Sequence, residues 1–317
     1  MSATPLVLVT GAAGFLGSEV MRVLHARGAR VIGIGHGPAP ALDGLQRASF
    51  WPGDITCETL IAHGGEPDII VHCAGGSSVS GSLADPQADF KKTVIGCEEV
   101  LSYLRTRRPD ARLVLSSSAA VYGTGHTAPI DEQTPLNPMS PYGFHKQMCE
   151  QMVSFHARTW GLKAAIVRLF SVYGAGLKRQ LLWDACRKFA AGTPLFSGTG
   201  EEVRDWVHVS DAATLLCDAA LHASTDVAIC NGATGHGASV GEILRQLAAA
   251  LGVQDGTARF DGIARPGDPA YLVGTADRAQ GWNWRPQVQA REGIRQYAHW
   301  FRSVTGEGDA QRAATSR

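Results

Sequence analysis

The N-terminal segment constrains the fold of this chain more than any other stretch. Residues 5–10 form a short apolar run, which predicts a buried strand. The run leads directly into GAAGFLG, with glycines at Gly11, Gly14 and Gly17, and then into an amphipathic segment that predicts a helix. Glycines in such a turn let the backbone approach a pyrophosphate, and the helix N-terminus supplies amide donors and positive potential. The segment therefore predicts a nucleotide-binding strand–turn–helix unit.

Further apolar runs follow along the first 170 residues, separated by segments that fit helices. We expect strands at residues 30–34, just before Gly53, at 68–72, at 112–115 and at 163–170, with a helix near 86–107. This alternation indicates an α/β fold with a doubly wound parallel sheet.

Beyond about residue 175 the alternation loosens, although helices are expected at 240–251 and 290–302. We interpret residues 1–175 as a dinucleotide-binding domain that strands from later segments complete. Residues 176–305 are interpreted as mainly a smaller substrate domain, and the small polar residues 306–317 as a disordered tail.

The cofactor side of the predicted cleft has one unusual feature. An acidic residue about 20 positions after the glycine turn usually holds the adenosine ribose of NAD, but this chain has Gly35 and His36 there. A 2′-phosphate is therefore tolerated in this interpretation, so NADP remains possible beside NAD. Asp54 follows the third expected strand and is placed at the adenine edge. The fourth strand ends in a glycine turn at Gly75, suited to running beneath a dinucleotide.

The chemistry is predicted to centre on the segment Ser140-Pro141-Tyr142-Gly-Phe-His-Lys146. Ser140 is a good N-cap and Pro141 suits the first helical position. Tyr142 and Lys146 then lie on one face of the helix, where a lysine ammonium favours the phenolate and lowers the pKa of the phenol. Ser118 ends the fifth strand, at the sheet edge where ligands of open α/β sheets bind.

The amino-acid composition limits the classes of binding partner and the cellular compartment that we expect. The 29 basic and 29 acidic residues give zero formal charge, which argues against nucleic acid or an anionic membrane as the main partner. Seven cysteines are scattered singly, which indicates reduced core thiols and neither a disulfide framework nor a metal site. We find no secretory leader and no run of the roughly 20 apolar residues that span a bilayer. A cytoplasmic enzyme is expected.

Together these segments resemble the extended short-chain dehydrogenase/reductases, specifically the nucleotide-sugar epimerase/dehydratase group. The likeness runs from Leu6 to about Phe301 and rests on seven blocks in order: TGAAGFLG, SSSAAVYG, PYGFHK, RLFSVYG, EEVRDWVHVSDAA, CNGATG and RPGD. The resemblance implies a Rossmann-type domain, a smaller C-terminal domain for a nucleotide-diphosphate sugar, and a homodimer formed through a four-helix bundle.

The resemblance also assigns roles to individual positions. The expected catalytic residues are Ser118, Tyr142 and Lys146. The expected cofactor-binding residues are Gly11, Gly14, Phe15, Leu16, Gly17, His36, Asp54, Ile55, Cys73, Ala74, Gly75, Tyr142 and Lys146. The expected substrate-binding residues are Ser118, Ser171, Arg204 and Arg265, with the arginines on the diphosphate because a planar guanidinium grips phosphate oxygens in pairs.

Three departures from the family pattern refine this expectation. Ser171 and Thr93 stand where many members have asparagine, and the acidic pair of the 4,6-dehydratases is absent after Ser118, which argues against dehydration. An NAD(P)-dependent 4-epimerase acting through a 4-keto sugar is the leading hypothesis. An NADPH-dependent 4-ketoreductase for a 4-keto-6-deoxy sugar is the alternative, and a non-catalytic nucleotide-binding module is a remote one.

Overall fold

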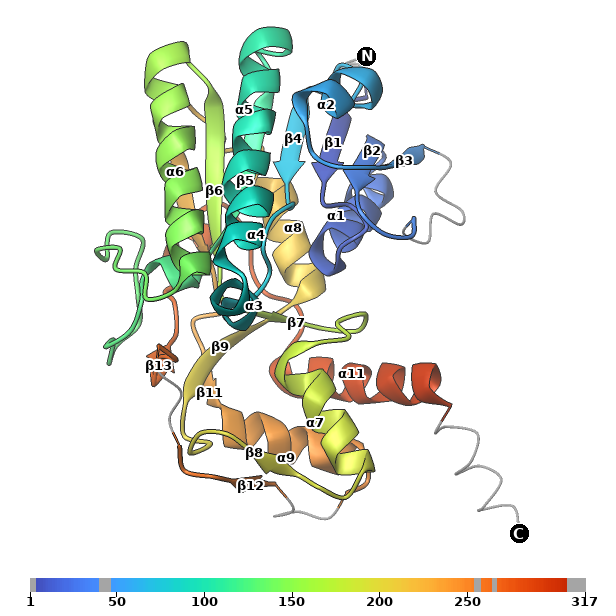
Figure 1. Ribbon diagram of the computed structural model, residues 1–317, viewed down its shortest axis with the longest axis vertical. Helices are drawn as coiled ribbons and strands as arrows, with labels where there is room; N and C mark the ends of the chain where they lie inside the picture. Colours follow the sequence, from blue (N-terminus) through green and yellow to red (C-terminus); the bar gives the residue numbers. More distant parts are fainter. Residues whose placement is uncertain (1–3, 40–46, 254–257, 264–266, 307–317) are drawn as a thin grey trace.

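A seven-stranded parallel sheet forms the centre of the molecule in the computed structural model, which describes residues 4–39, 47–253, 258–263 and 267–306 (Figure 1). Its strands, in spatial order, are β10 (Ala228–Gly232), β6 (Lys163–Leu169), β5 (Arg112–Ser118), β4 (Ile69–His72), β1 (Leu6–Thr10), β2 (Arg30–Gly35) and β3 (Ala48–Pro52). Strand order reverses between β1 and β4, so a crevice is expected at their carboxyl ends. The predicted doubly wound sheet is confirmed.

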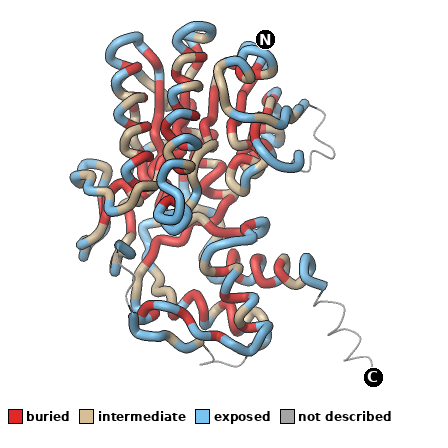
Figure 2. Tube along the Cα trace, viewed as in Figure 1, coloured by how far each residue is buried: buried red, intermediate tan, exposed pale blue. Residues whose placement is uncertain are grey.

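Alternating side chains of the strands build one core on each face of this sheet. Val7 and Val9 pack toward α1 (Phe15–Ala26) and α8 (Val209–Ala219), which contact each other. Leu8 points the opposite way, into the core shared with α2 (Cys57–His63), α5 (Gly96–Arg107) and α6 (Pro141–Trp160). Strands with both faces covered have continuous apolar runs, and the central strands β1, β4, β5 and β6 are mostly buried in Figure 2.

The helix expected near residues 86–107 is present but not uniform. It consists of α4 (Pro86–Phe90), a π-helical turn at Lys91–Ile95, and α5, and it follows the short helix α3 (Val79–Ala84). A π-turn is rare and commonly lies at a functional site. Here it lies beside the loop that follows β4.

A second lobe lies beyond the carboxyl ends of the central strands (Figure 1). Its core is formed by α7 (Gln180–Ala190), α9 (Val240–Ala250) and α11 (Ala290–Thr305), which pack together with aromatic side chains. Its strands are β7 (Ser171–Tyr173), β9 (Val203–His208), β11 (Gly237–Ser239) and β13 (Tyr271–Leu272), with a separate pair of β8 (Leu195–Phe196) and β12 (Arg259–Phe260); α10 (Asp277–Gly281) follows β13. The helices expected at 240–251 and 290–302 correspond to α9 and α11.

The remaining expectations concern the cysteines, the membrane and the tail. None of the seven cysteines, all of which lie within the described residues, is in a disulfide, and five of them are buried. Among the described residues no helix is long and apolar enough to cross a membrane. Helix α11 ends at a left-handed Gly306, and residues 307–317 of the predicted tail lie outside the described residues.

Candidate active site

A cavity of about 1470 Å³ lies between the carboxyl ends of the central strands and the second lobe. Its walls include every described residue that the sequence predicted for the site. These are Gly11, Gly14, Phe15, Leu16, Gly17, His36, Asp54, Ile55, Cys73, Ala74, Gly75, Ser118, Tyr142, Lys146, Ser171 and Arg204. Arg265 lies outside the described residues. One cavity thus gathers residues from the whole length of the chain.

The glycine turn after β1 is packed so closely that side chains do not fit. Gly11 has φ of +69°, and a Cβ there would lie 2.7 Å from the backbone nitrogen of Ala74. A Cβ on Gly17 would collide with the carbonyl oxygen of Gly11. Gly14 caps α1 without a side chain, which leaves the first amides of the helix facing the cavity wall. This backbone cradle fits a dinucleotide pyrophosphate.

Where β2 and β3 end, the cavity wall holds a contact between a histidine and a carboxylate that the sequence did not reveal. His36 Nε2 lies 2.6 Å from Asp54 Oδ1, and both side chains are largely exposed. The two residues follow β2 and β3, whose ends are joined by a hydrogen bond from Gly53 N to Gly35 O of 3.0 Å. A carboxylate from the end of β3 therefore lies beside the residue that follows β2, where the sequence has no acidic side chain.

The start of α6 places the predicted base at the cavity. The side chain of Ser140 accepts a hydrogen bond from Gly143 N, as the sequence predicted for an N-cap. Tyr142 N donates to Ser82 Oγ at 3.0 Å, which docks α3 onto the first turn. A Cβ on Gly143 would lie 2.5 Å from the carbonyl oxygen of Ala120, so the helix approaches the turn that follows β5 as closely as a glycine permits.

Lys146 lies one turn further along the same face of α6. Its side chain is buried, and Nζ donates to the carbonyl oxygen of Ser116 at 2.9 Å. Nζ also lies 6.0 Å from the centre of the Tyr142 ring. Ser118, two residues after that carbonyl, lines the cavity and its Oγ accepts from Ala120 N at 3.2 Å. A serine hydroxyl, a phenol and an ammonium group therefore face the same space.

The loop after β4 forms the floor beside these groups. Thr93, from the π-turn, accepts a hydrogen bond from Gly76 N to its Oγ1 at 2.8 Å, and so holds the loop from behind. Burial raises the pKa of the Cys73 thiol to about 12, despite the opposing charge of Lys146. Cys73 is therefore a neutral wall residue near neutral pH.

The second lobe contributes charged and polar groups to the opposite wall. Arg204 in β9 is nearly buried and its Nη2 lies 2.6 Å from Asp268 Oδ1. Lys188 on α7 lines the same wall, and Gln180 at the start of α7 has φ of +64° and donates from Nε2 to Ser77 O at 3.2 Å. The sequence analysis missed Lys188, Gln180 and Asp268 as wall residues, because single polar residues on a loop or helix carry no pattern.

Comparison with known proteins agrees with this geometry. Residues 7–230 match the model of the NAD dependent epimerase/dehydratase family. The chain belongs to this family. A UDP-glucose 4-epimerase from Azospirillum brasilense is 32% identical over 345 aligned positions, covering 100% of this chain and 98% of that enzyme.

Solved structures of family members have the same fold. The UDP-glucose 4-epimerase of Thermotoga maritima, solved with UDP-glucose, gives a TM-score of 0.84 at 27% identity, covering 95% of this chain and 99% of that one. MoeE5, solved with UDP-glucuronic acid and NAD, gives 0.85 at 26% identity, covering 94% and 99%. The extended short-chain dehydrogenase/reductase resemblance is confirmed.

Proposed function

We propose that this protein is an NAD-dependent nucleotide-sugar 4-epimerase that acts on a UDP-hexose. The observation that carries the proposal is the convergence of the Gly11–Gly17 cradle, Ser118, Tyr142 and Lys146 on one cavity. The relatives named above support the NAD and UDP-sugar part, because two of them are UDP-glucose 4-epimerases and the solved ones hold a UDP-sugar, in MoeE5 together with NAD. These names favour epimerisation over the single reduction of a ketoreductase, and NAD over NADP.

The proposed mechanism assigns one task to each side chain. Tyr142, as the phenolate, removes the proton from the C4 hydroxyl, and Ser118 hydrogen-bonds the same oxygen. Lys146 stabilises the negative charge on the phenol oxygen and holds the ribose. NAD, when bound, supplies an acceptor for the C4 hydrogen and returns it. Between these two transfers the 4-keto sugar rotates in the cavity, so that the hydride returns to the opposite face of C4 and Tyr142 gives its proton back to the C4 oxygen.

The second lobe is proposed as the substrate domain, with a boundary near residue 175. Arg204 would grip the diphosphate, in competition with Asp268, and Ser171 would contact the sugar. Arg265, which the family resemblance assigns to the diphosphate, is proposed to bind it as well. We also propose a cytoplasmic location, because cysteines outside disulfides suit a reducing compartment.

The test of this function begins with the purified, untreated protein. Denaturation should release NAD, identified by its mass, and the native protein should interconvert UDP-glucose and UDP-galactose within a panel of UDP- and GDP-sugars. Release of NADP, together with net reduction of a 4-keto-6-deoxy sugar, would support the ketoreductase instead. Release of a nucleotide without conversion of any sugar would support the non-catalytic nucleotide-binding module.

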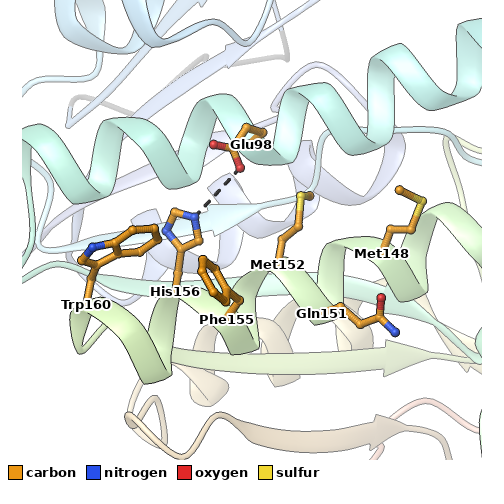
Figure 3. A pocket seen from close by; sticks show the side chains of 7 residues that line it. All are labelled: Glu98, Met148, Gln151, Met152, Phe155, His156 and Trp160. Atoms are coloured by element: carbon orange, nitrogen blue, oxygen red, sulfur yellow. Dashed lines mark ion pairs between the residues drawn. The ribbon is translucent and has the colours of Figure 1, made fainter.

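We further propose that the protein is a homodimer that pairs through α5 and α6. A hollow of about 400 Å³ on these helices is lined by Glu98, Met148, Gln151, Met152, Phe155, His156 and Trp160 (Figure 3). Phe155 and Trp160 are each about half exposed and meet edge to face, with ring centres 5.4 Å apart. Exposed aromatic and methionine side chains in one patch are typical of protein–protein interfaces.

The dimer is tested by light scattering at micromolar concentration. Wild-type protein should have the mass of two chains, and Phe155→Asp should have the mass of one, because a buried unpaired charge is costly. Leu221→Asp is the matched control, since Leu221 is 72% exposed and lies away from these helices. A monomeric wild-type protein would refute the dimer and leave the enzymatic proposal standing.

A further inference from the structure

A row of polar side chains crosses the central sheet just behind the proposed active site. Ser117 of β5 is paired with Arg168 of β6, and Arg168 is paired with Asn231 of β10. Paired residues of neighbouring parallel strands project to the same face of a sheet, here the face covered by α6. On this face of the sheet the three residues follow apolar positions of their strands, such as Leu115 in β5 and Ile166 in β6.

The carboxylate of Glu150, on α6, is hydrogen-bonded to two residues of this row. Both of its carboxylate oxygens accept from the Arg168 guanidinium, at 3.1 and 3.2 Å from Nε and at 2.7 Å from Nη2. Ser117 Oγ donates to Glu150 Oε1 at 2.5 Å. Only 4% of Glu150 and 4% of Arg168 is exposed. Although burial opposes it, hydrogen bonding to Glu150 raises the pKa of Arg168, so the guanidinium stays charged.

The network continues away from Glu150 to the loop that precedes α6. Arg168 Nη1 donates to the hydroxyl of Tyr122 at 3.0 Å and to the carbonyl oxygen of Glu132 at 3.2 Å. The Tyr122 hydroxyl donates to Asn231 Oδ1 at 2.7 Å. Each nitrogen of the Arg168 guanidinium and each oxygen of the Glu150 carboxylate therefore has at least one hydrogen-bond partner, which limits the penalty of burying this ion pair.

The position of Glu150 on α6 connects this network to the chemistry. Tyr142, Lys146 and Glu150 follow one another at intervals of four residues and share one face of the helix. On β5, Ser116 O binds Lys146 and Ser117 Oγ binds Glu150. Two successive turns of α6 are thus fixed to two successive residues of β5. The next residue of β5 is Ser118, and the preceding turn of α6 carries Tyr142.

From this arrangement we propose that Glu150, held by Arg168 and Ser117, is a positioning residue that sets the register between α6 and β5. It thereby fixes the Tyr142 hydroxyl relative to Ser118. The inference rests on the proposed function. A buried ion pair adds little stability compared with apolar residues of the same volume, so its presence here is explained better by geometry than by stabilisation.

The decisive variant is Ser117→Ala, because Glu150→Ala would leave Arg168 buried without its counter-ion and endanger folding. Ser117→Ala removes one hydrogen bond and keeps the ion pair. Ser154→Ala is the matched control, since Ser154 Oγ donates to the backbone oxygen of Glu150 at 2.8 Å on the same helix. Each variant is assayed as the purified enzyme with its bound nucleotide, and rates are normalised to the nucleotide content.

We expect kcat of Ser117→Ala to fall at least tenfold with KM unchanged, and the isotope effect of C4-deuterated UDP-glucose to rise as the chemical step becomes limiting. Ser154→Ala should match wild type in both. A merely structural role would lower the yield or the thermal midpoint without changing the isotope effect, and that result would overturn the positioning role. If the wild-type protein itself epimerises no sugar, the failure belongs to the proposed function.

Discussion

The Lys146 ammonium donates a hydrogen bond to the carbonyl oxygen of Ser116 at 2.9 Å, on the strand that ends at Ser118. This bond places a buried positive charge between the strand with the proposed hydrogen-bond donor and the helix with the proposed base. The position of the charge is therefore tied to the backbone of β5. Single variants can measure separately what the Lys146 charge, the Tyr142 base and the cofactor-binding residues contribute.

Lys146→Met tests the charge. We expect kcat to fall about 10²-fold, the scale of losing support for a general base, and NAD to be retained less tightly. Epimerisation rate and nucleotide content of the purified variant are the two measurements. Lys163→Met, at the exposed start of β6, is the control and should behave as wild type. An unchanged rate in Lys146→Met would contradict the assigned role.

Tyr142→Phe tests the base. Removing only the hydroxyl should lower kcat by about 10²-fold or more while NAD stays bound, since the backbone cradle is untouched. Tyr103→Phe is a matched control, because its hydroxyl binds Gly65 O far from the cavity residues. A protein that only binds nucleotide would show no difference between these two variants.

His36→Ala tests the adenosine end. If His36, oriented by Asp54, hydrogen-bonds the adenosine ribose, its loss should weaken NAD binding about tenfold, the scale of one charge-assisted hydrogen bond. Dissociation constants for NAD and NADP are measured by fluorescence titration of nucleotide-free protein. His25→Ala, in the last turn of α1, should leave both constants unchanged. Equal constants in His36→Ala and wild type would remove His36 from the site.

Gly17→Ala tests the cradle. A methyl group there would strike the carbonyl oxygen of Gly11, so the turn must shift and NAD should be lost from the purified protein. Gly281→Ala is the control, because a Cβ at Gly281 meets no atom within 4 Å. Mass analysis of the released nucleotide compares the two. Full NAD content in Gly17→Ala would show that the turn does not carry the pyrophosphate.

The buried His72 predicts a pH dependence of stability. Burial, with a smaller contribution from the charge of Lys146, lowers the pKa of His72 to about 3, while in the unfolded chain it is near 6.5. Between these values the unfolded chain binds a proton that the folded protein does not, so acidification favours unfolding by about 1.4 kcal/mol per pH unit. The contribution of neutral His72 to the free energy of unfolding is fully present above pH 6.5 and is lost progressively below it.

The measurement is urea unfolding of wild type and His72→Asn at several values between pH 7.5 and 5. Asparagine keeps a hydrogen-bonding group near Thr10, whose hydroxyl lies 2.7 Å from His72 Nδ1. The variant should lose free energy of unfolding less steeply below pH 6.5, because the other histidines with lowered pKa contribute equally to both proteins. Parallel slopes would show that His72 is not the proton-binding group.

The sequence predicted those features that local patterns encode. The strands of the first 170 residues, the glycine turn and the capped start of α6 follow from apolar runs, Gly11–Gly17 and Ser140-Pro141. Helix α7 was not predicted, although Leu182, Ala185, Cys186 and Phe189 have helical spacing, because it lies beyond residue 175, where the regular alternation of strands and helices loosens.

The pairing of distant residues was beyond a single sequence. Glu150 looks like an ordinary polar position of a helix, and Arg168 like an interruption of an apolar strand. Their contact depends on the packing of α6 over the register of β5 and β6, which no short motif specifies. The same holds for Arg204 and Asp268, which are 64 residues apart.

The cavity takes its two walls from different parts of the chain, and this division has an evolutionary consequence. The wall with Ser118, Tyr142 and Lys146 belongs to the central sheet and α6, whereas Lys188 and Arg204 project from the second lobe. In the proposed enzyme, substitutions confined to α7 and β9 would change which sugar is accepted and leave Ser118, Tyr142 and Lys146 untouched. Such an architecture lets a lineage diversify its substrates without reinventing its chemistry.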